Sequence, residues 1–287
     1  MTKYKGICLS SGGVNGVVQL GVLHEMFMND ELDELSYFSG CSIGSIICFL
    51  LAIGYTPIEI LTHSCDKKFA SQVTHINVMN IPSMYGLYPI SIITDKLKEL
   101  ALVKLGYNPS FKDLLLLGKN LIITTYCLGS SNGDPIPDDE KYLFISADNF
   151  PDMKIIDAIA MSSAIPIIFQ QVIYEGRIYI DGCCNTNFPI YELEYIVPIG
   201  EPIIGITIKY KENDLSTLFG YINALLNISL TANDISRVSS RTRVIELPIM
   251  HANYMLSITT TQKIKMFIDG SRHYKQLNTT TLSNKML

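Results

Sequence analysis

The pentapeptide Gly40-Cys41-Ser42-Ile43-Gly44 is the first part of the sequence that could do chemistry. It matches the pattern G-x-S-x-G, with a short strand-like segment before it and an apolar, helix-like segment after it. In that context the pattern is typical of a nucleophile elbow, a sharp turn that exposes a serine hydroxyl for attack on an acyl carbon. The two glycines would leave room for the turn, and the helix N-terminus would favour negative charge. The same residues also fit a plain strand-to-helix connection.

A second glycine-rich segment, residues 9–16 (LSSGGVNG), falls between the first predicted strand and the first predicted helix. Its backbone N–H groups could bind a nucleotide phosphate, or they could stabilise the oxyanion that forms in acyl transfer. Gly12 and Gly13 are adjacent, so the dinucleotide pattern G-x-G-x-x-G is not satisfied. No Gly-Lys-Ser/Thr follows, so the P-loop pattern is excluded as well. An oxyanion loop and a plain turn both remain open.

Asp181 ends the predicted strand 177–180, and Gly182 follows it. A carboxylate in that position can point into a cleft and act as a base, although Asp-Gly is also a common turn sequence. A second such pair, Asp269-Gly270, follows a helical pattern, and we expect it to end that helix.

Predicted strands alternate with predicted helices along most of the chain. Strands are expected at 4–9, 37–39, 121–127, 143–145, 172–174, 177–180, 203–208 and 243–247. Helices are expected at 17–28, 45–53, 90–105, 155–161, 218–226 and 261–277, and capping boxes start two more at Thr56 and Ser110. The alternation predicts one domain over residues 1–287, a three-layer α/β/α fold around a mainly parallel central sheet.

Bulk composition narrows the function classes. Hydrophobic residues make up 48% of the chain, the formal net charge is −5, and no Lys/Arg-rich run occurs, so nucleic-acid binding is not expected. The seven cysteines form no C-x-x-C pair, and the N-terminus lacks a secretory signal; both favour a cytoplasmic protein over a secreted one. The most apolar stretch, 46–53, is shorter than the roughly 20 residues of a membrane span, so any membrane contact would be peripheral.

In their order along the chain, these features resemble the patatin-like phospholipase family. Four segments carry the resemblance: 9–23 (LSSGGVNGVVQLGVL), 40–45 (GCSIGS), 155–169 (IIDAIAMSSAIPIIF) and 179–189 (YIDGCCNTNFP). Three positions depart from the family's usual residues. Ser11 stands for the first of three glycines, Asn15 replaces an arginine or lysine, and Cys183 stands where glycine or alanine is common.

The resemblance implies a patatin-like fold and a Ser–Asp dyad in place of a Ser–His–Asp triad. Ser42 would attack the ester carbonyl, Asp181 would take its proton and later activate water, and N–H groups of Gly12, Gly13 and Val14 would bind the oxyanion. No metal ion or organic cofactor is implied. The expected activity is release of a fatty acyl chain from a phospholipid or lysophospholipid. Because a carboxylate is a poor base for a hydroxyl group, Asp181 needs desolvation that raises its pKa.

Other interpretations remain open: a neutral-lipid or acyl-thioester hydrolase, a non-catalytic lipid-binding protein that keeps the fold, and a nucleotide-binding protein built on the glycine loop. The oligomeric state is not predicted. None of the five histidines (His24, His63, His75, His251 and His273) has a triad context, although a triad that uses His251 stays open. The charge-free segment 76–90 is either a lid or lipid-facing loop over the site or a buried connection.

Overall fold

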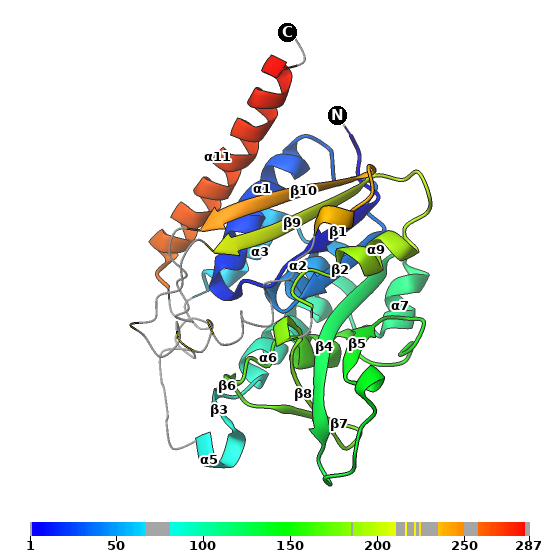
Figure 1. Ribbon diagram of the computed structural model, residues 1–287. Helices are drawn as coiled ribbons and strands as arrows, with labels where there is room; N and C mark the ends of the chain where they lie inside the picture. Colours follow the sequence, from blue (N-terminus) through cyan, green and yellow to red (C-terminus); the bar gives the residue numbers. More distant parts are fainter. Residues whose placement is uncertain are drawn as a thin grey trace.

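A mixed eight-stranded sheet organises the protein, as the computed structural model shows (Figure 1). The structure describes residues 2–66, 81–184, 186–210, 216, 221, 224, 235–249 and 258–284. The strands are β1 (Gly6–Leu9), β2 (Tyr37–Cys41), β4 (Asn120–Ser130), β5 (Tyr142–Ile145), β7 (Val172–Tyr174), β8 (Arg177–Asp181), β9 (Ile203–Tyr210) and β10 (Thr242–Ile249). Their order is β10-β9-β1-β2-β4-β8-β7, with β5 also paired to β4.

Strands β10, β9, β1, β2 and β4 are parallel, whereas β8, β7 and β5 join as antiparallel strands. The predicted mainly parallel sheet is therefore confirmed. The hairpin between β7 and β8 turns at Glu175 and Gly176, which both have positive φ. Asp181 is therefore the last residue of β8, a strand that runs antiparallel to β4.

Helices cover both faces of this sheet. The helices of the described part of the chain are α1 (Gly16–Met28), α2 (Ile43–Ala52), α3 (Pro57–Ser64), α5 (Ile81–Met84), α6 (Ser91–Leu105), α7 (Phe111–Leu116), α8 (Ile155–Ser162), α9 (Ile190–Ile196) and α11 (Thr260–Asn284). Short 3-10 turns are η1 (Gly13–Asn15), η3 (Asp138–Glu140), η4 (Gly182–Cys184) and η5 (Ile235–Arg237). The predicted capping boxes at Thr56 and Ser110 are present and begin α3 and α7. No helix in the described part of the chain has the length and apolarity to cross a membrane.

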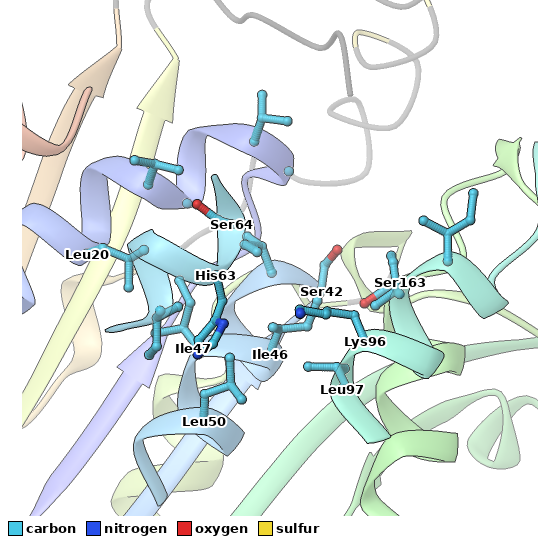
Figure 2. Close-up of a pocket in the computed structure, with 18 of the residues that line it drawn as sticks. Leu20, Ser42, Ile46, Ile47, Leu50, His63, Ser64, Lys96, Leu97 and Ser163 are labelled. Carbon is cyan, nitrogen blue, oxygen red and sulfur yellow. The ribbon is translucent and has the colours of Figure 1, made fainter. Parts of the chain in front are cut away.

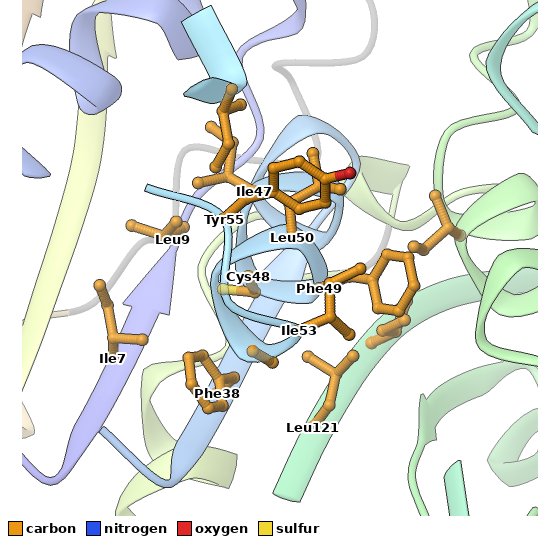
Figure 3. Packing of buried hydrophobic residues seen from close by; sticks show 14 of the residues in the cluster. Ile7, Leu9, Phe38, Ile47, Cys48, Phe49, Leu50, Ile53, Tyr55 and Leu121 are labelled. Atoms are coloured by element: carbon orange, nitrogen blue, oxygen red, sulfur yellow. The ribbon is translucent and has the colours of Figure 1, made fainter. Parts of the chain in front are cut away.

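Strand β1 shows how the three layers arise. Its side chains alternate between the two faces, as in any strand. Ile7 and Leu9 join the large core under α1 and α2, while Cys8 packs with α9 on the opposite face. Figure 3 shows the first of these cores, where α2 lies on β1, β2 and β4. Because both faces are buried, the strand is apolar throughout, as its sequence indicated.

The expectation that Asp269-Gly270 ends a helix is wrong. Helix α11 runs through Gly270 to Asn284 beside α1 (Figure 1). Glycine is needed there because the two helix backbones meet: a Cβ on Gly270 would lie 2.0 Å from the Val18 carbonyl oxygen. Gly21 of α1 is equally close to α11, since its Cβ would lie 2.0 Å from the Phe267 carbonyl oxygen. Close helix packing, and not a helix end, explains this glycine.

We expect Gly270→Ala to lower the free energy of unfolding by about 1–3 kcal/mol, the usual range for overpacking. A new methyl group must push α11 away from α1, and this outweighs the better helix propensity of alanine. Chemical denaturation measures the change. Asp269→Ala, on the neighbouring exposed position, is the control and should shift stability by less than about 0.5 kcal/mol. Equal stability of wild type and Gly270→Ala would contradict the close packing.

Several elements lie outside what the sequence predicted. Strands β3 (Gly86–Tyr88) and β6 (Ile167–Phe169) form a small parallel sheet, and α9 was not expected. Of the segment 76–90, residues 76–80 lie outside the described residues. In the rest, Leu87 and Tyr88 are buried, as in a connection, whereas Tyr85 is 62% exposed. The helix expected at 218–226 also falls largely outside the described residues.

Candidate active site

The glycine loop and the serine elbow lie against each other at one end of the sheet. Strands β1 and β2 are parallel neighbours, with Leu9 paired to Gly40, so the loops that follow them leave side by side. Missing side chains allow the contact: a Cβ on Gly44 would lie 2.2 Å from the Leu9 carbonyl oxygen, and one on Gly16 would lie 2.4 Å from Ile43 Cγ1. Gly16 and Gly44 therefore have one structural cause, which is close packing of the two turns.

Ser42 has the strained backbone of a nucleophile elbow. Its φ of 51° and ψ of −120° place it where side-chain-bearing residues are rare. Hydrogen bonds hold this conformation from both sides. The Ser42 N–H donates to Ser162 Oγ at 2.8 Å, and the Ser42 carbonyl oxygen accepts from Ser45 Oγ at 2.6 Å and from the Ile46 N–H at 3.2 Å. The turn is thus fixed before any ligand arrives.

Strand β4 separates Ser42 from Asp181. Cys41 at the end of β2 pairs with Thr124, and Asp181 at the end of β8 pairs with Thr125. Two strand spacings, about 10 Å, therefore lie between the backbones, and the elbow and the side chains close this gap. Ser42 Oγ donates a hydrogen bond of 2.7 Å to Asp181 Oδ2. The structure brings together the two residues that the sequence singled out.

Asp181 is fully buried, and this environment changes its acidity. Burial disfavours the charged carboxylate and raises the pKa of Asp181 to about 6. Hydrogen bonds limit the rise: the Cys183 N–H donates to Oδ1 at 2.8 Å, and Ser42 donates to Oδ2. Gly182 permits this approach, since a Cβ there would lie 2.3 Å from the Thr124 carbonyl oxygen. The carboxylate is a stronger base than an exposed aspartate, as the expected chemistry requires.

The glycine loop begins the short turn η1. Gly13 has a φ of 52°, the left-handed region that favours glycine. The first backbone hydrogen bond of the turn runs from the Asn15 N–H to the Gly12 carbonyl oxygen, so the Gly13 and Val14 amides precede it and have no acceptor within the turn. Gly13, Val14 and Ser42 line one cavity, whereas Gly12 is not among the described residues that line it.

Ser11 is accommodated without strain. It is not among the five non-glycine residues with positive φ in the described part of the chain. Its N–H donates to Asn187 Oδ1 at 3.1 Å and to the Asn187 carbonyl oxygen at 3.2 Å, and its hydroxyl also donates to Oδ1. The serine thus ties the glycine loop to the segment that follows Asp181.

Two positioning residues were not singled out from the sequence. Asn187 belongs to the Asn-x-Pro that closes the segment 179–189, and Ser162 belongs to the segment 155–169. Both segments carry the family resemblance, so the signal was present, but neither spacing nor residue type shows which loop each residue holds. Ser162 accepts from the elbow, and Asn187 accepts from the glycine loop.

An apolar cavity of about 200 Å³ opens beside Ser42 (Figure 2). Its polar lining includes Ser42, Ser163, Lys96 and His63. The rest is largely aliphatic: Val17, Leu20, Ile43, Ile46, Ile47, Leu50, Ile60, Ile92, Ile93, Leu97 and Leu100. Binding sites for small molecules share this character, an apolar wall with a few placed polar groups.

The family model for the patatin-like phospholipase domain matches residues 7–193, more than half of the chain. The chain belongs to the patatin-like phospholipase family. The glycine loop, the serine elbow and Asp181 all fall inside the matched region. The family resemblance drawn from the sequence is therefore confirmed.

Relatives of this patatin-like chain occur in viruses. A protein of Invertebrate iridescent virus 6 named "Probable lipid hydrolase 463L" is 33% identical over 199 residues; the match takes in 65% of this chain and 62% of that protein. An uncharacterized protein of Acanthamoeba polyphaga mimivirus is 28% identical, over 96% of this chain and 94% of its own length. Among solved structures, VipD from Legionella pneumophila gives a TM-score of 0.51 at 15% identity, covering 96% of this chain and 66% of VipD. That last likeness concerns the fold, and it confirms the patatin-like architecture.

The histidines have varied surroundings. His63 of α3 lines the cavity, which the sequence did not predict, and its ring packs edge-on against Tyr55 at 5.5 Å. His24 packs against Phe267, and His273 lies in α11. His75 and His251 lie outside the described residues, so the histidine triad stays an open alternative.

Proposed function

We propose that this patatin-like protein hydrolyses fatty acyl esters of lipids, with Ser42 as nucleophile and Asp181 as base. The observation that carries the proposal is the 2.7 Å hydrogen bond from a strained serine to a buried carboxylate, beside an apolar cavity. The serine hydroxyl already points its proton at the group that would take it. An aliphatic wall beside the nucleophile suits an acyl chain.

The reaction would proceed in two steps. Ser42 Oγ attacks the ester carbon while its proton passes to Asp181, and the Gly13 and Val14 amides, with Gly12 beside them, stabilise the oxyanion. The leaving alcohol takes the proton from Asp181 as the C–O bond breaks, which leaves an acyl-serine. Asp181 then removes a proton from water, whose oxygen attacks the acyl-serine, and Ser42 regains the proton when the fatty acid leaves.

The cavity supports the proposed substrate class. Its apolar lining favours a fatty acyl chain, and we infer a phospholipid or lysophospholipid as the ester. All seven cysteines are free thiols, which supports a cytoplasmic protein that would meet lipid at a membrane surface. Residues 1–287 would act as one domain, because β2 and β8, which carry the dyad, belong to one sheet.

A substrate panel tests the proposal. Wild-type protein would be assayed with a phosphatidylcholine vesicle, a lysophosphatidylcholine, a triacylglycerol emulsion and an acyl-CoA thioester, and labelled with a fluorophosphonate probe. We expect label on Ser42 and release of fatty acid from the two phospholipids. Activity only on the triacylglycerol or only on the acyl-CoA would identify a neutral-lipid hydrolase or a thioesterase instead of a phospholipase. No label and no hydrolysis would point to a non-catalytic binding protein.

We expect kcat/KM to fall on the acid side of about pH 6 and to level off above it. Asp181 must be ionised to accept the Ser42 proton, and its raised pKa sets the point where half of the free enzyme carries a usable base. Below that point the rate should drop about tenfold per pH unit. Initial rates on a soluble ester between pH 4.5 and 8 measure the profile, after incubation controls for stability. A rate that stays level down to pH 4.5 would contradict the role of Asp181.

A further inference from the structure

Ser163 lies between two residues that hold the dyad in place. Its neighbour on one side, Ser162, accepts the Ser42 N–H at 2.8 Å. Its neighbour on the other side, Ala164, accepts the Asp181 N–H through its carbonyl oxygen at 3.0 Å. The position of Ser163 relative to the reacting groups is therefore fixed from both sides, and its side chain lines the cavity.

The Ser163 hydroxyl has no hydrogen-bond partner in the described part of the chain, although the residue is only 3% exposed. A buried hydroxyl without a partner is costly, so each such group needs an explanation. Unpartnered buried atoms also occur on Gln19, His24, Asn108, Asn120, Glu192 and Thr207. Among these residues and Ser163, Ser163 alone lines the cavity beside Ser42. A ligand bound in this cavity could therefore be the hydrogen-bond partner of the Ser163 hydroxyl.

The neighbouring polar groups are already occupied. The Lys96 ammonium bonds Asp66 at 3.4 Å and Glu99 at 2.9 Å, so two carboxylates offset its charge. Lys263, which also lines the cavity, donates to the Ser64 carbonyl oxygen. Because two carboxylates offset the charge of Lys96, the part of the cavity next to Lys96 suits a neutral hydrogen-bonding group better than an anion.

Figure 2 shows where such a group would lie. In this view Ser163 lies on one side of Ser42, and the aliphatic residues Leu20, Ile47 and Leu50 lie on the other. An acyl chain that packs on the aliphatic side, with its ester carbon at Ser42 Oγ, would direct its alcohol part towards Ser163.

We propose that the Ser163 hydroxyl hydrogen-bonds an oxygen of the alcohol part of the acyl ester. Ser163 would make the enzyme prefer esters of polyols such as glycerol over esters of simple alcohols. This inference rests on the proposed ester hydrolysis at Ser42. A serine hydroxyl can donate and accept, which matches the free hydroxyl and ether-type oxygens of a glycerol ester. A site built to bond a substrate oxygen discriminates against the analogue that lacks it.

The test compares two esters of one fatty acid, monodecanoylglycerol and ethyl decanoate, in the same detergent micelles. We expect Ser163→Ala to lower kcat/KM on the glycerol ester by about 10- to 100-fold, and on the ethyl ester by less than about 3-fold. Ser163→Cys replaces the hydroxyl with a weak donor. On the glycerol ester, its kcat/KM should lie between those of wild type and Ser163→Ala. Thr207→Val is the control, because it removes another unpartnered buried hydroxyl that does not line the cavity. It should change neither ester by more than about 2-fold.

Each other outcome overturns the inference. An equal loss on both esters would mean that Ser163 acts on the dyad and not on the alcohol. No loss on the glycerol ester would mean that the hydroxyl touches no substrate. In both cases wild type is active and the proposed function stands. Wild type that hydrolyses neither ester would overturn the ester hydrolase proposal and, with it, the role of Ser163.

Discussion

Replacing Ser42 with alanine should lower acyl-ester hydrolysis by about 10³-fold or more, and Asp181→Asn should cause a loss of similar size. Alanine has no nucleophile, and an asparagine amide cannot accept the Ser42 proton. Neither change should disturb the fold, because alanine fits the space of serine and asparagine keeps the shape of aspartate. Initial rates on a lysophospholipid, with EDTA present throughout, measure the effect.

Matched changes away from the site provide the control. Ser131 lies in the exposed loop after β4, and Asp138 is an exposed partner of Lys141. Ser131→Ala and Asp138→Asn should keep wild-type rates. If Asp181→Asn stayed active while Ser42→Ala did not, another group would have to take the serine proton. Substitution of His251, the open alternative from the sequence, would then be the next experiment.

The sequence could single out Ser42 and Asp181 because both residues belong to short, local patterns. Ser42 sits in a turn whose glycines can be recognised, and Asp181 ends a strand that its own residues indicate. Their 2.7 Å contact across β4 follows once strand order is known, but strand order depends on pairings between distant segments. In the sequence, only the family resemblance implied that Ser42 and Asp181 act together.

Other parts of the site could not be read in this way. Ser163 looks like any serine near a helix end, and only the packing of the fold shows that it lines the cavity beside Ser42. Gly270 was misread for the same reason. A glycine that ends a helix and a glycine that lets two helices touch give the same local pattern. The contact between Gly270 and the Val18 carbonyl oxygen distinguishes the two cases, and the sequence does not show it. The structural role of such residues depends on tertiary contacts, which the local sequence does not show.

The burial that makes Asp181 a base should also cost stability, and this cost should depend on pH. An unfolded aspartate loses its proton near pH 4, whereas folded Asp181 keeps it up to about pH 6. Between these values the folded state binds more protons than the unfolded state, so stability falls as pH rises. A shift of about two pKa units corresponds to roughly 3 kcal/mol, lost by about pH 6 and constant above it.

Asp181→Asn isolates this effect, because asparagine carries no charge at any pH. Relative to wild type, the variant should gain about 2–3 kcal/mol of unfolding free energy between pH 4 and pH 8. Urea denaturation of both proteins at each pH measures the difference, and other titrating groups cancel in it. Asp138→Asn is the control and should show almost no trend over this range, because Lys141 lowers the pKa of exposed Asp138 and its titration then lies below about pH 4. If the difference for Asp181→Asn stayed constant from pH 4 to pH 8, Asp181 would titrate like an unfolded aspartate. A carboxylate of that kind would be too weak a base for Ser42, so stability measured without any substrate bears directly on the mechanism.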